Sequence, residues 1–360
     1  MLCLLEETAY GVATMRCNQP EVPVHVGVGS WPLFELKKNP LDFIYGNPPC
    51  AAWSNAGAAT KGGRSWRSSP LVACTERHFS LLEELRPRAW AWESVQRAWT
   101  LGEGFVRELA ARAMAWGYSV TIFLHNAAYL GVPQTRKRFF MLAHSVELTL
   151  PEPGWSFKTI EEALRGLNDP GEPLERNLGK VRHLLRDMKQ GENLSSTWSR
   201  LTPLAKQVRG ARGQMVGRPP FTIKRARSNQ PAPVVMHELI HPTEHRGLSL
   251  KELGILCGYP PGYEWVGARD AGQVGRGVCP PVGEYLARQV AAALHQNVPI
   301  KRPRLRLIDF TQPPARYEEL SMPSERAKPR VSVRAAIDQA PLEPPKQGSG
   351  AYTRELLQRQ

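Results

Sequence analysis

The chain has 360 residues, 42% of them hydrophobic, and a formal net charge of +14 at pH 7. This content is enough for one large core or two modest ones, and the excess of Lys and Arg favours a polyanionic partner, although a merely soluble basic surface would have the same charge. Six scattered cysteines without metal-ligand spacing, no signal peptide and no long apolar stretch exclude a disulfide framework and a membrane span. We therefore expect a reduced, soluble, cytoplasmic protein with no membrane partner and no metal.

Short apolar runs alternate with amphipathic segments through the first half of the chain. Two segments, 75–87 and 104–117, place apolar residues at helical spacing and end near Pro or Gly, which predicts helices. The alternation predicts an α/β fold with parallel strands. The predicted strands are 1–5, 22–27, 41–46, 89–94, 119–125 and 138–144.

The second half is less regular. After Glu147 the chain is rich in Pro, Gly and Arg over 151–230, which predicts a separate, irregular and basic region. From about Val298 it becomes Pro-rich and charged, which is typical of a disordered basic tail. The helices predicted in this half are 159–167, 179–188, 249–257 and 281–296.

One cysteine follows a predicted strand in the stretch GNPPCAAWS. Two prolines stiffen the loop before Cys50, and ligands of parallel α/β sheets bind at the carboxyl ends of strands. Cys50 is therefore a candidate nucleophile, the alternative being a small buried hydrophobic residue. Glu93 ends another predicted strand, and Gln134, Arg136 and Arg138 alternate into the next one. Taken singly, Glu93 is also typical of a solvated or capping carboxylate, and the two arginines are also typical of a row of charged side chains on the surface.

In this order the segments resemble the DNA cytosine-C5 methyltransferase family over residues 6–296. They are similar to its Pro-Pro-Cys, Glu-Asn-Val and Gln-x-Arg-x-Arg motifs, and HPTEHRGLSLKELGILCGYPPGYEW and QVGRGVCPPVGEYLARQ resemble its two closing motifs. Each motif alone is weak evidence, whereas five in order are strong. The matching residues are Pro48, Pro49, Cys50, Glu93, Ser94, Val95, Gln134, Arg136 and Arg138.

The resemblance implies an α/β fold, with the Rossmann-like sheet of an S-adenosylmethionine-dependent methyltransferase and a small irregular target-recognition domain. It assigns 1–148 and 233–297 to the catalytic domain, 149–232 to target recognition and 298–360 to the tail. The implied activity is that of a DNA (cytosine-5-)-methyltransferase, which acts on a flipped-out cytosine of double-stranded DNA through a covalent cysteine adduct.

The chemistry explains why these residue types are needed. Carbon 5 of cytosine is a poor nucleophile, so a thiolate must first add to carbon 6, and the resemblance gives this role to Cys50. Glu93 would stabilise ring nitrogen 3, Arg138 would hold the carbonyl oxygen of the base, and Arg136 would brace the loop. A solvated basic loop is the alternative for the basic region. The implied substrate-binding residues are Ser54, Gln134, Arg209, Arg212 and Arg225.

The family's opening strand and glycine-rich cofactor loop have no counterpart in the sequence. We expect a truncated or mis-set start, a second polypeptide that supplies this segment, or a rearranged fold. Val28, Ser94 and Arg276 also depart from the family pattern. Arg276 could pair with the carboxylate of carboxy-S-adenosylmethionine, which would make the reaction a carboxymethyl transfer, or it could contact a DNA phosphate. The implied cofactor residues are Glu6, Asn47, Pro48, Arg276 and Val278.

A different class of function, a non-catalytic DNA-binding homologue or subunit, stays open because the cofactor loop has no counterpart. Cys50, Glu93 and Arg138 argue against it, since a protein that only binds DNA needs no nucleophile. The resemblance further implies a bacterial or phage-encoded protein of restriction-modification, associated with the nucleoid.

Overall fold

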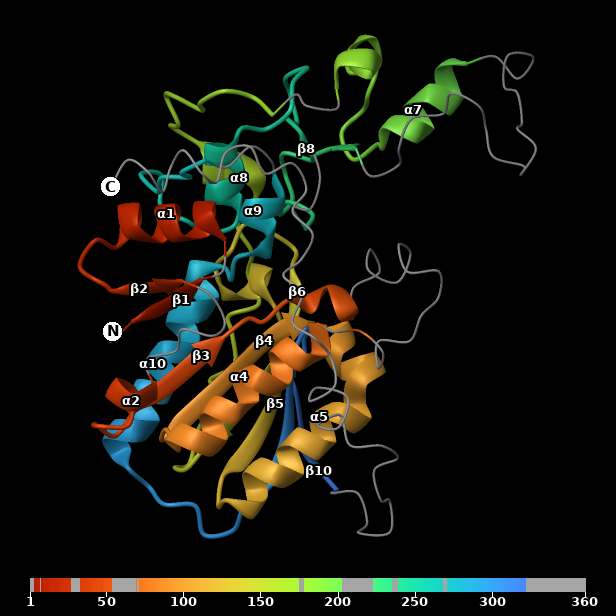
Figure 1. Ribbon diagram of the computed structural model, residues 1–360. Helices are drawn as coiled ribbons and strands as arrows, with labels where there is room; N and C mark the ends of the chain where they lie inside the picture. Colours follow the sequence, from red (N-terminus) through yellow and green to blue (C-terminus); the bar gives the residue numbers. More distant parts are fainter. Residues whose placement is uncertain are drawn as a thin grey trace.

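The computed structural model describes residues 3–6, 8–26, 33–53, 69, 71–174, 178–202, 223–234, 239–267 and 271–321. Ser54, Val28, Arg209 and Arg212 lie outside these ranges. A six-stranded sheet of order β10-β9-β5-β6-β4-β3 forms the centre of the described chain (Figure 1). Its strands are β3 (Phe43–Gly46), β4 (Ala89–Val95), β5 (Ser119–Asn126), β6 (Lys137–His144), β9 (Leu305–Phe310) and β10 (Arg316–Leu320).

Helices cover both faces of this sheet, which gives three layers (Figure 1). The apolar residues of α4 (Leu71–Leu85) and α5 (Arg97–Ala115) form one core with the sheet. Those of α8 (Leu250–Leu256) and α10 (Pro280–Gln296) form a second core on the other face. The arrangement confirms the predicted α/β methyltransferase-like fold. The other helical segments are α1 (Ala9–Asn18), α2 (Leu33–Leu36), η1 (Cys50–Ala52), η3 (Ala127–Leu130), α6 (Ile160–Leu164), η4 (Gly179–Leu184), α7 (Leu194–Leu201) and α9 (Ala271–Arg276).

Strand β4 shows how the sequence assigns residues to the two cores. Successive side chains of a strand point to opposite faces, so the stretch AWAWES separates its tryptophans from its alanines. Trp90 and Trp92 are fully buried against α4 and α5, whereas Ala89 and Ala91 belong to the core beneath α10. Glu93 has the same parity as the alanines, and its side chain therefore lies on the α10 face.

The prediction of a parallel sheet is wrong in part, because the sheet is mixed. β3 pairs with β4 and β5 with β9 in parallel, but β6 is antiparallel to both β4 and β5. Only residues 127–136 connect β5 to β6. A parallel crossover needs about a dozen residues or more, so this short connection returns the chain antiparallel beside the strand it has just left.

The predicted tail does not begin at Val298. Residues 305–310 form β9, which pairs with β5 along its length, and 316–320 form the antiparallel strand β10. Four side chains of β9 are at most 5% exposed, because LRLIDF is an apolar strand inside a charged and Pro-rich stretch. The charged residues of β10 then form the edge of the sheet, which disfavours pairing with other chains. Residues 322–360 lie outside the described ranges.

A small unit lies beside the main body (Figure 1). It contains η4, α7 and a parallel pair of two-residue strands, β7 (Lys224–Arg225) and β8 (Leu239–Ile240). A third apolar cluster forms its core, which is consistent with a separate irregular region in this part of the sequence. The cluster consists of Leu178, Leu184, Leu185, Met188, Leu194, Ile223 and Ile240.

Strands β1 (Leu4–Glu6) and β2 (Val24–Val26) form a two-stranded parallel sheet of their own, with α1 between them in the chain. Thr8 caps α1 by accepting a hydrogen bond from the Gly11 amide, a capping signal that the sequence analysis missed. Within the described ranges, every helix is too short or too polar to cross a lipid bilayer.

Candidate active site

The predicted catalytic residues converge on the α10 face of the sheet, where β4 ends and β6 begins. Arg138 of β6 is in register with Val95 on one side and with His125 of β5 on the other. Because residues in register point to the same face, the end of β4 and the end of β5 flank Arg138. The short β5–β6 connection therefore places an arginine beside the carboxylate of β4.

Glu93 and Arg138 form a buried ion pair. Glu93 Oε1 lies 3.2 Å from Arg138 Nε, and the two side chains are 7% and 11% exposed. Burial raises the pKa of the Glu93 carboxyl, and the nearby Arg138 and Arg136 oppose that rise. Arg138 also donates through Nη1 to the carbonyl of Lys137 at 2.9 Å. The pair is thus a fixed cation beside a carboxyl group that binds a proton more readily than usual.

Cys50 begins the 3₁₀ turn η1, directly after the Pro-Pro loop that follows β3. Its half-buried thiol has a raised pKa, first because of burial and second because of the negative charge of Glu93. Arg138 and Arg136 act in the opposite direction. Cys50, Glu93 and Arg138 are therefore electrostatically coupled, and the negative charge of Glu93 disfavours the thiolate form of Cys50.

Trp53 anchors this loop and was missed by sequence reasoning. It is 1% exposed, and its ring stacks on Phe105 at 5.9 Å between ring centroids. Gly102 interrupts the helical backbone of α5 at this contact, and a Cβ there would lie 2.6 Å from the Trp53 ring. The missing side chain of Gly102 thus makes room for the indole, which lies three residues after Cys50.

Arg136 joins the sheet to the segment after α9. Its Nη1 donates to the carbonyl of Gly275 at 2.9 Å and its Nη2 to that of Gly277 at 2.8 Å. The side chain is 2% exposed. These contacts agree with the bracing role expected for Arg136.

Two predicted substrate-binding residues are buried and bonded within the protein. Gln134 is fully buried and donates through Nε2 to Cys257 Sγ at 3.3 Å. Arg225 is 3% exposed, and its Nη atoms donate to the carbonyls of Leu185, His241 and other residues of the small unit. In this structure each group is enclosed by protein and bonds other residues of the chain. Their contacts with DNA stay predictions.

The predicted cofactor residues come together from three parts of the chain. Asn47 Nδ2 donates to the carbonyl of Arg276 at 3.3 Å, and Arg276 Nη1 donates to Tyr10 Oη at 2.9 Å. Glu6 ends β1, and its Oε1 accepts hydrogen bonds from the amide and hydroxyl of Thr8, both at 2.8 Å. Pro48 and Val278 are half-buried in the loops beside Asn47 and Arg276.

Comparison with known proteins agrees with this geometry. The family model "C-5 cytosine-specific DNA methylase" matches residues 29–292, which is most of the chain. The Type II methyltransferase M1.HphI of Haemophilus parahaemolyticus is 27% identical over 276 residues, covering 72% of this chain and 70% of the relative. M.MthTI of Methanothermobacter thermautotrophicus is 25% identical, covering 73% and 87%.

Solved structures show the same fold at lower identity. An E. coli prophage protein assigned as a DNA modification methyltransferase superposes with a TM-score of 0.59 at 19% identity, covering 82% of this chain and 93% of that one. The Dnmt2 methyltransferase of S. pombe superposes with a TM-score of 0.51 at 12% identity, covering 82% and 91%.

The chain belongs to the C-5 cytosine-specific DNA methylase family. This confirms the resemblance drawn from the motifs and the enzyme class, DNA cytosine-C5 methyltransferase. The family implies S-adenosylmethionine as the methyl donor. The side chains of Glu6 and Asn47 fit the hydroxyl and amino-acid groups of that molecule, because a carboxylate accepts and a carboxamide both donates and accepts hydrogen bonds.

Proposed function

We propose that this protein methylates carbon 5 of a cytosine flipped out of double-stranded DNA, through a covalent adduct with Cys50. The observation that carries the proposal is the buried Glu93–Arg138 pair, electrostatically coupled to Cys50 beside it. Cys50 Sγ would add to carbon 6, Glu93 would share a proton with ring nitrogen 3, and Arg138 would donate to the carbonyl oxygen. S-adenosylmethionine supplies the methyl group when bound, and Glu6, Asn47, Pro48 and Val278 would hold it.

The pKa shifts suggest how the nucleophile is activated. The charge of Glu93 is the second-largest cause of the raised pKa of Cys50. When Glu93 and ring nitrogen 3 of the bound cytosine hold between them a proton taken up from solvent, the negative charge of Glu93 is partly neutralised, while the positive charges of Arg138 and Arg136 stay in place. The pKa of Cys50 then falls, so binding of the correct base favours the thiolate.

The small unit would grip the DNA. Its surface exposes basic side chains, which suits contact with phosphates and a salt-dependent affinity. Type II methyltransferases among the relatives favour a role in restriction-modification, on nucleoid DNA of a bacterial or phage-infected cell. The exposed basic residues include Arg182, Arg186, Lys189, Lys224 and Arg227.

Replacement of the nucleophile tests the activity. We expect Cys50→Ala to abolish both methylation and covalent trapping on DNA that contains 5-fluorocytosine, because no other group can form the adduct. DNA binding in a gel-shift assay should change by less than about threefold. The exposed Cys17→Ala is the matched control and should keep full trapping.

A Cys50→Ala variant that still methylates DNA would contradict the assignment of the nucleophile. A further outcome is a wild-type protein that binds DNA without methylating it or becoming trapped on it. If this holds both with and without the second polypeptide proposed below, it would favour the non-catalytic alternative.

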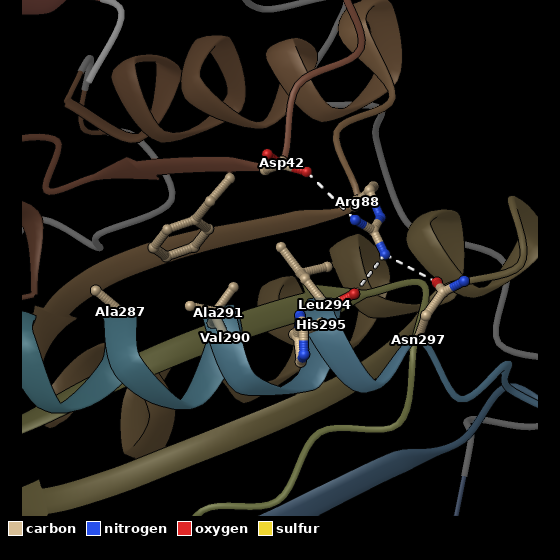
Figure 2. Close-up of a pocket in the computed structure, with 9 residues that line it drawn as sticks. Asp42, Arg88, Ala287, Val290, Ala291, Leu294, His295 and Asn297 are labelled. Atoms are coloured by element: carbon tan, nitrogen blue, oxygen red, sulfur yellow. Dashed lines mark hydrogen bonds and ion pairs between the residues drawn. The ribbon is translucent and has the colours of Figure 1, made fainter.

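We also propose that a strand from a second polypeptide completes the sheet. Strand β3 pairs only with β4 among the described residues, and β1–β2 forms a separate sheet. A cavity of about 660 Å³ lies beside β3, with an apolar wall from α10 (Figure 2). Arg88 closes its rim by bonding Asp42 at 3.4 Å and Asn297 at 2.8 Å. The apolar residues that line it are Phe43, Ala287, Val290, Ala291 and Leu294.

Amide hydrogen exchange tests this completion. The free edge of β3 should exchange quickly in the purified chain and become protected when a polypeptide that carries the family's opening strand and glycine-rich loop is added, because a new parallel strand bonds those groups. Methylation should rise with the same titration. Slow exchange at 43–46 and full activity in the isolated chain would show that no second polypeptide is needed.

A further inference from the structure

His125 is a buried side chain of β5 to which the proposed reaction gives no role. It is 1% exposed, and its ring lies 5.1 Å from that of Phe123 and 5.4 Å from that of Phe140. The pKa of His125 is lowered to about 3, first by burial and then by Arg138 and Arg136, so the imidazole is neutral near pH 7. Its Nδ1 is buried without a hydrogen-bond partner among the described residues, which is costly for a polar atom.

A small cavity lies between this ring and the catalytic groups. Its residues include His125, Glu93, Arg136 and Arg138, and its volume of about 10 Å³ is close to what one water molecule occupies. The cavity is polar enough to keep a water, because guanidinium groups donate and a carboxylate accepts. A water here would accept from a guanidinium and donate to both Glu93 and the lone pair of Nδ1, which gives it three partners.

We propose that a bound water links His125 Nδ1 to the Glu93–Arg138 pair, and that His125 is thereby a positioning residue for this pair. Arg138 lies on the middle strand of three, with Glu93 on β4 to one side and His125 on β5 to the other. The direct bond to Glu93 restrains the guanidinium from one side, and the bridging water restrains it from the other. The bridge itself rests on the structure, and its effect on catalysis rests on the proposed function.

Imidazole NMR of the full chain labelled with ¹⁵N-histidine tests the bridge without any need for activity. The His125 signals are identified by their loss in His125→Asn. Between pH 6 and pH 8 we expect a neutral ring whose Nδ1 carries a lone pair, with a long-lived water contact to that ring. A protonated Nδ1, or a dry cavity in a high-resolution crystal structure of the protein, would overturn the proposal.

Two variants test the positioning role. His125→Phe keeps an aromatic ring against Phe123 and Phe140 but removes both nitrogens, and we expect kcat to fall about tenfold with an unchanged KM for S-adenosylmethionine. His125→Asn can place an amide oxygen close to the position of Nδ1, and kcat should recover to within about threefold. Phe123→Leu disturbs the same packing without removing the acceptor and serves as the control.

The outcomes separate this inference from the proposed function. The positioning role would be overturned if His125→Phe had the kcat of the wild type. It would also be overturned if kcat fell equally in the Phe and Asn variants at equal thermal stability. If neither the wild type nor any variant that keeps Cys50 is trapped on DNA, the covalent mechanism is wrong. The NMR result would still decide whether the water bridge exists. If His125→Phe fails to fold, the NMR measurement on the wild-type chain decides alone.

Discussion

The four arginines of the predicted site have three kinds of environment. Arg138 pairs with a buried carboxylate, whereas Arg136 and Arg225 donate to main-chain carbonyls, and Arg276 is exposed and bonds a tyrosine hydroxyl. The spacing of Arg136 and Arg138 predicted two related side chains, and both are indeed buried in the site. No sequence pattern revealed the carbonyls that enclose Arg225, because they come from segments 16 to 40 positions away.

Arg276 makes a specific prediction about the donor. If its guanidinium pairs with a carboxylate on the donor, Arg276→Asn should shift the preference from carboxy-S-adenosylmethionine toward S-adenosylmethionine by about tenfold or more, because a charge-assisted hydrogen bond contributes about 1.5–3 kcal/mol. Mass spectrometry of cytosines after reaction with both donors in competition measures this ratio.

The control for the donor experiment is Arg288→Asn, an exposed arginine of α10 that pairs with Glu284. It should leave the product ratio unchanged. If the wild-type enzyme yields only 5-methylcytosine, and Arg276→Asn yields the same, the altered donor is ruled out and Arg276 is better explained as a phosphate contact.

At the scale of elements, the strands of the first half were predictable and those near the end of the described chain were not. The runs that became β3 to β6 are strongly apolar, even though β3 lies at the edge of the sheet and is only half-buried. Their directions depend on connection length, which the alternation of elements does not encode. The tail prediction averaged composition over sixty residues, and this average concealed the apolar side chains of β9. The Trp53–Gly102 contact joins segments far apart in sequence and left no local signal.

Two truncations test the place of β9 in the fold. Ending the chain at residue 298 removes four buried apolar side chains and leaves one side of β5 without a partner strand, a loss on the order of 6–12 kcal/mol, comparable with the whole stability of a domain. We expect this variant to be insoluble or unfolded. Ending the chain at residue 321 should keep the melting temperature within a few degrees in calorimetry, and equal stability of the two variants would contradict the assignment of β9.

At the scale of the whole molecule, three buried histidines make stability depend on pH. The pKa of His78 is lowered to about 4, that of His125 to about 3 and that of His144 to about 4, in each case chiefly by burial. The unfolded chain binds protons at these sites below about pH 6.5, whereas the folded chain does not. Stability must therefore fall as the pH drops from 6.5 toward 4.

Urea unfolding at pH 7.5 and pH 5.5 measures this loss. Between these two pH values each histidine lowers the free energy of unfolding by about 1.4 kcal/mol in total, because only about one pH unit lies below its unfolded pKa, so the three together account for about 4 kcal/mol. Glu93 acts in the opposite direction, because its raised pKa stabilises the fold as the pH falls. His144→Gln should reduce the dependence by about a third, and equal stability at both pH values would refute the assignment of neutral buried histidines.

The chain leaves the main core after Leu174 and re-enters it at Ala226, and farther on the amide and carbonyl of Ala232 bond the backbone of Pro133 and Thr135. Both crossing points pack against the same core, and the contacts of Glu93, Arg136 and Arg138 described above involve no residue between them. If the segment between them reads the DNA, as proposed, genetic recombination at these two positions would exchange one recognition segment for another and leave the catalytic groups in place. A lineage with this architecture would then change the DNA sequence it modifies in a single event.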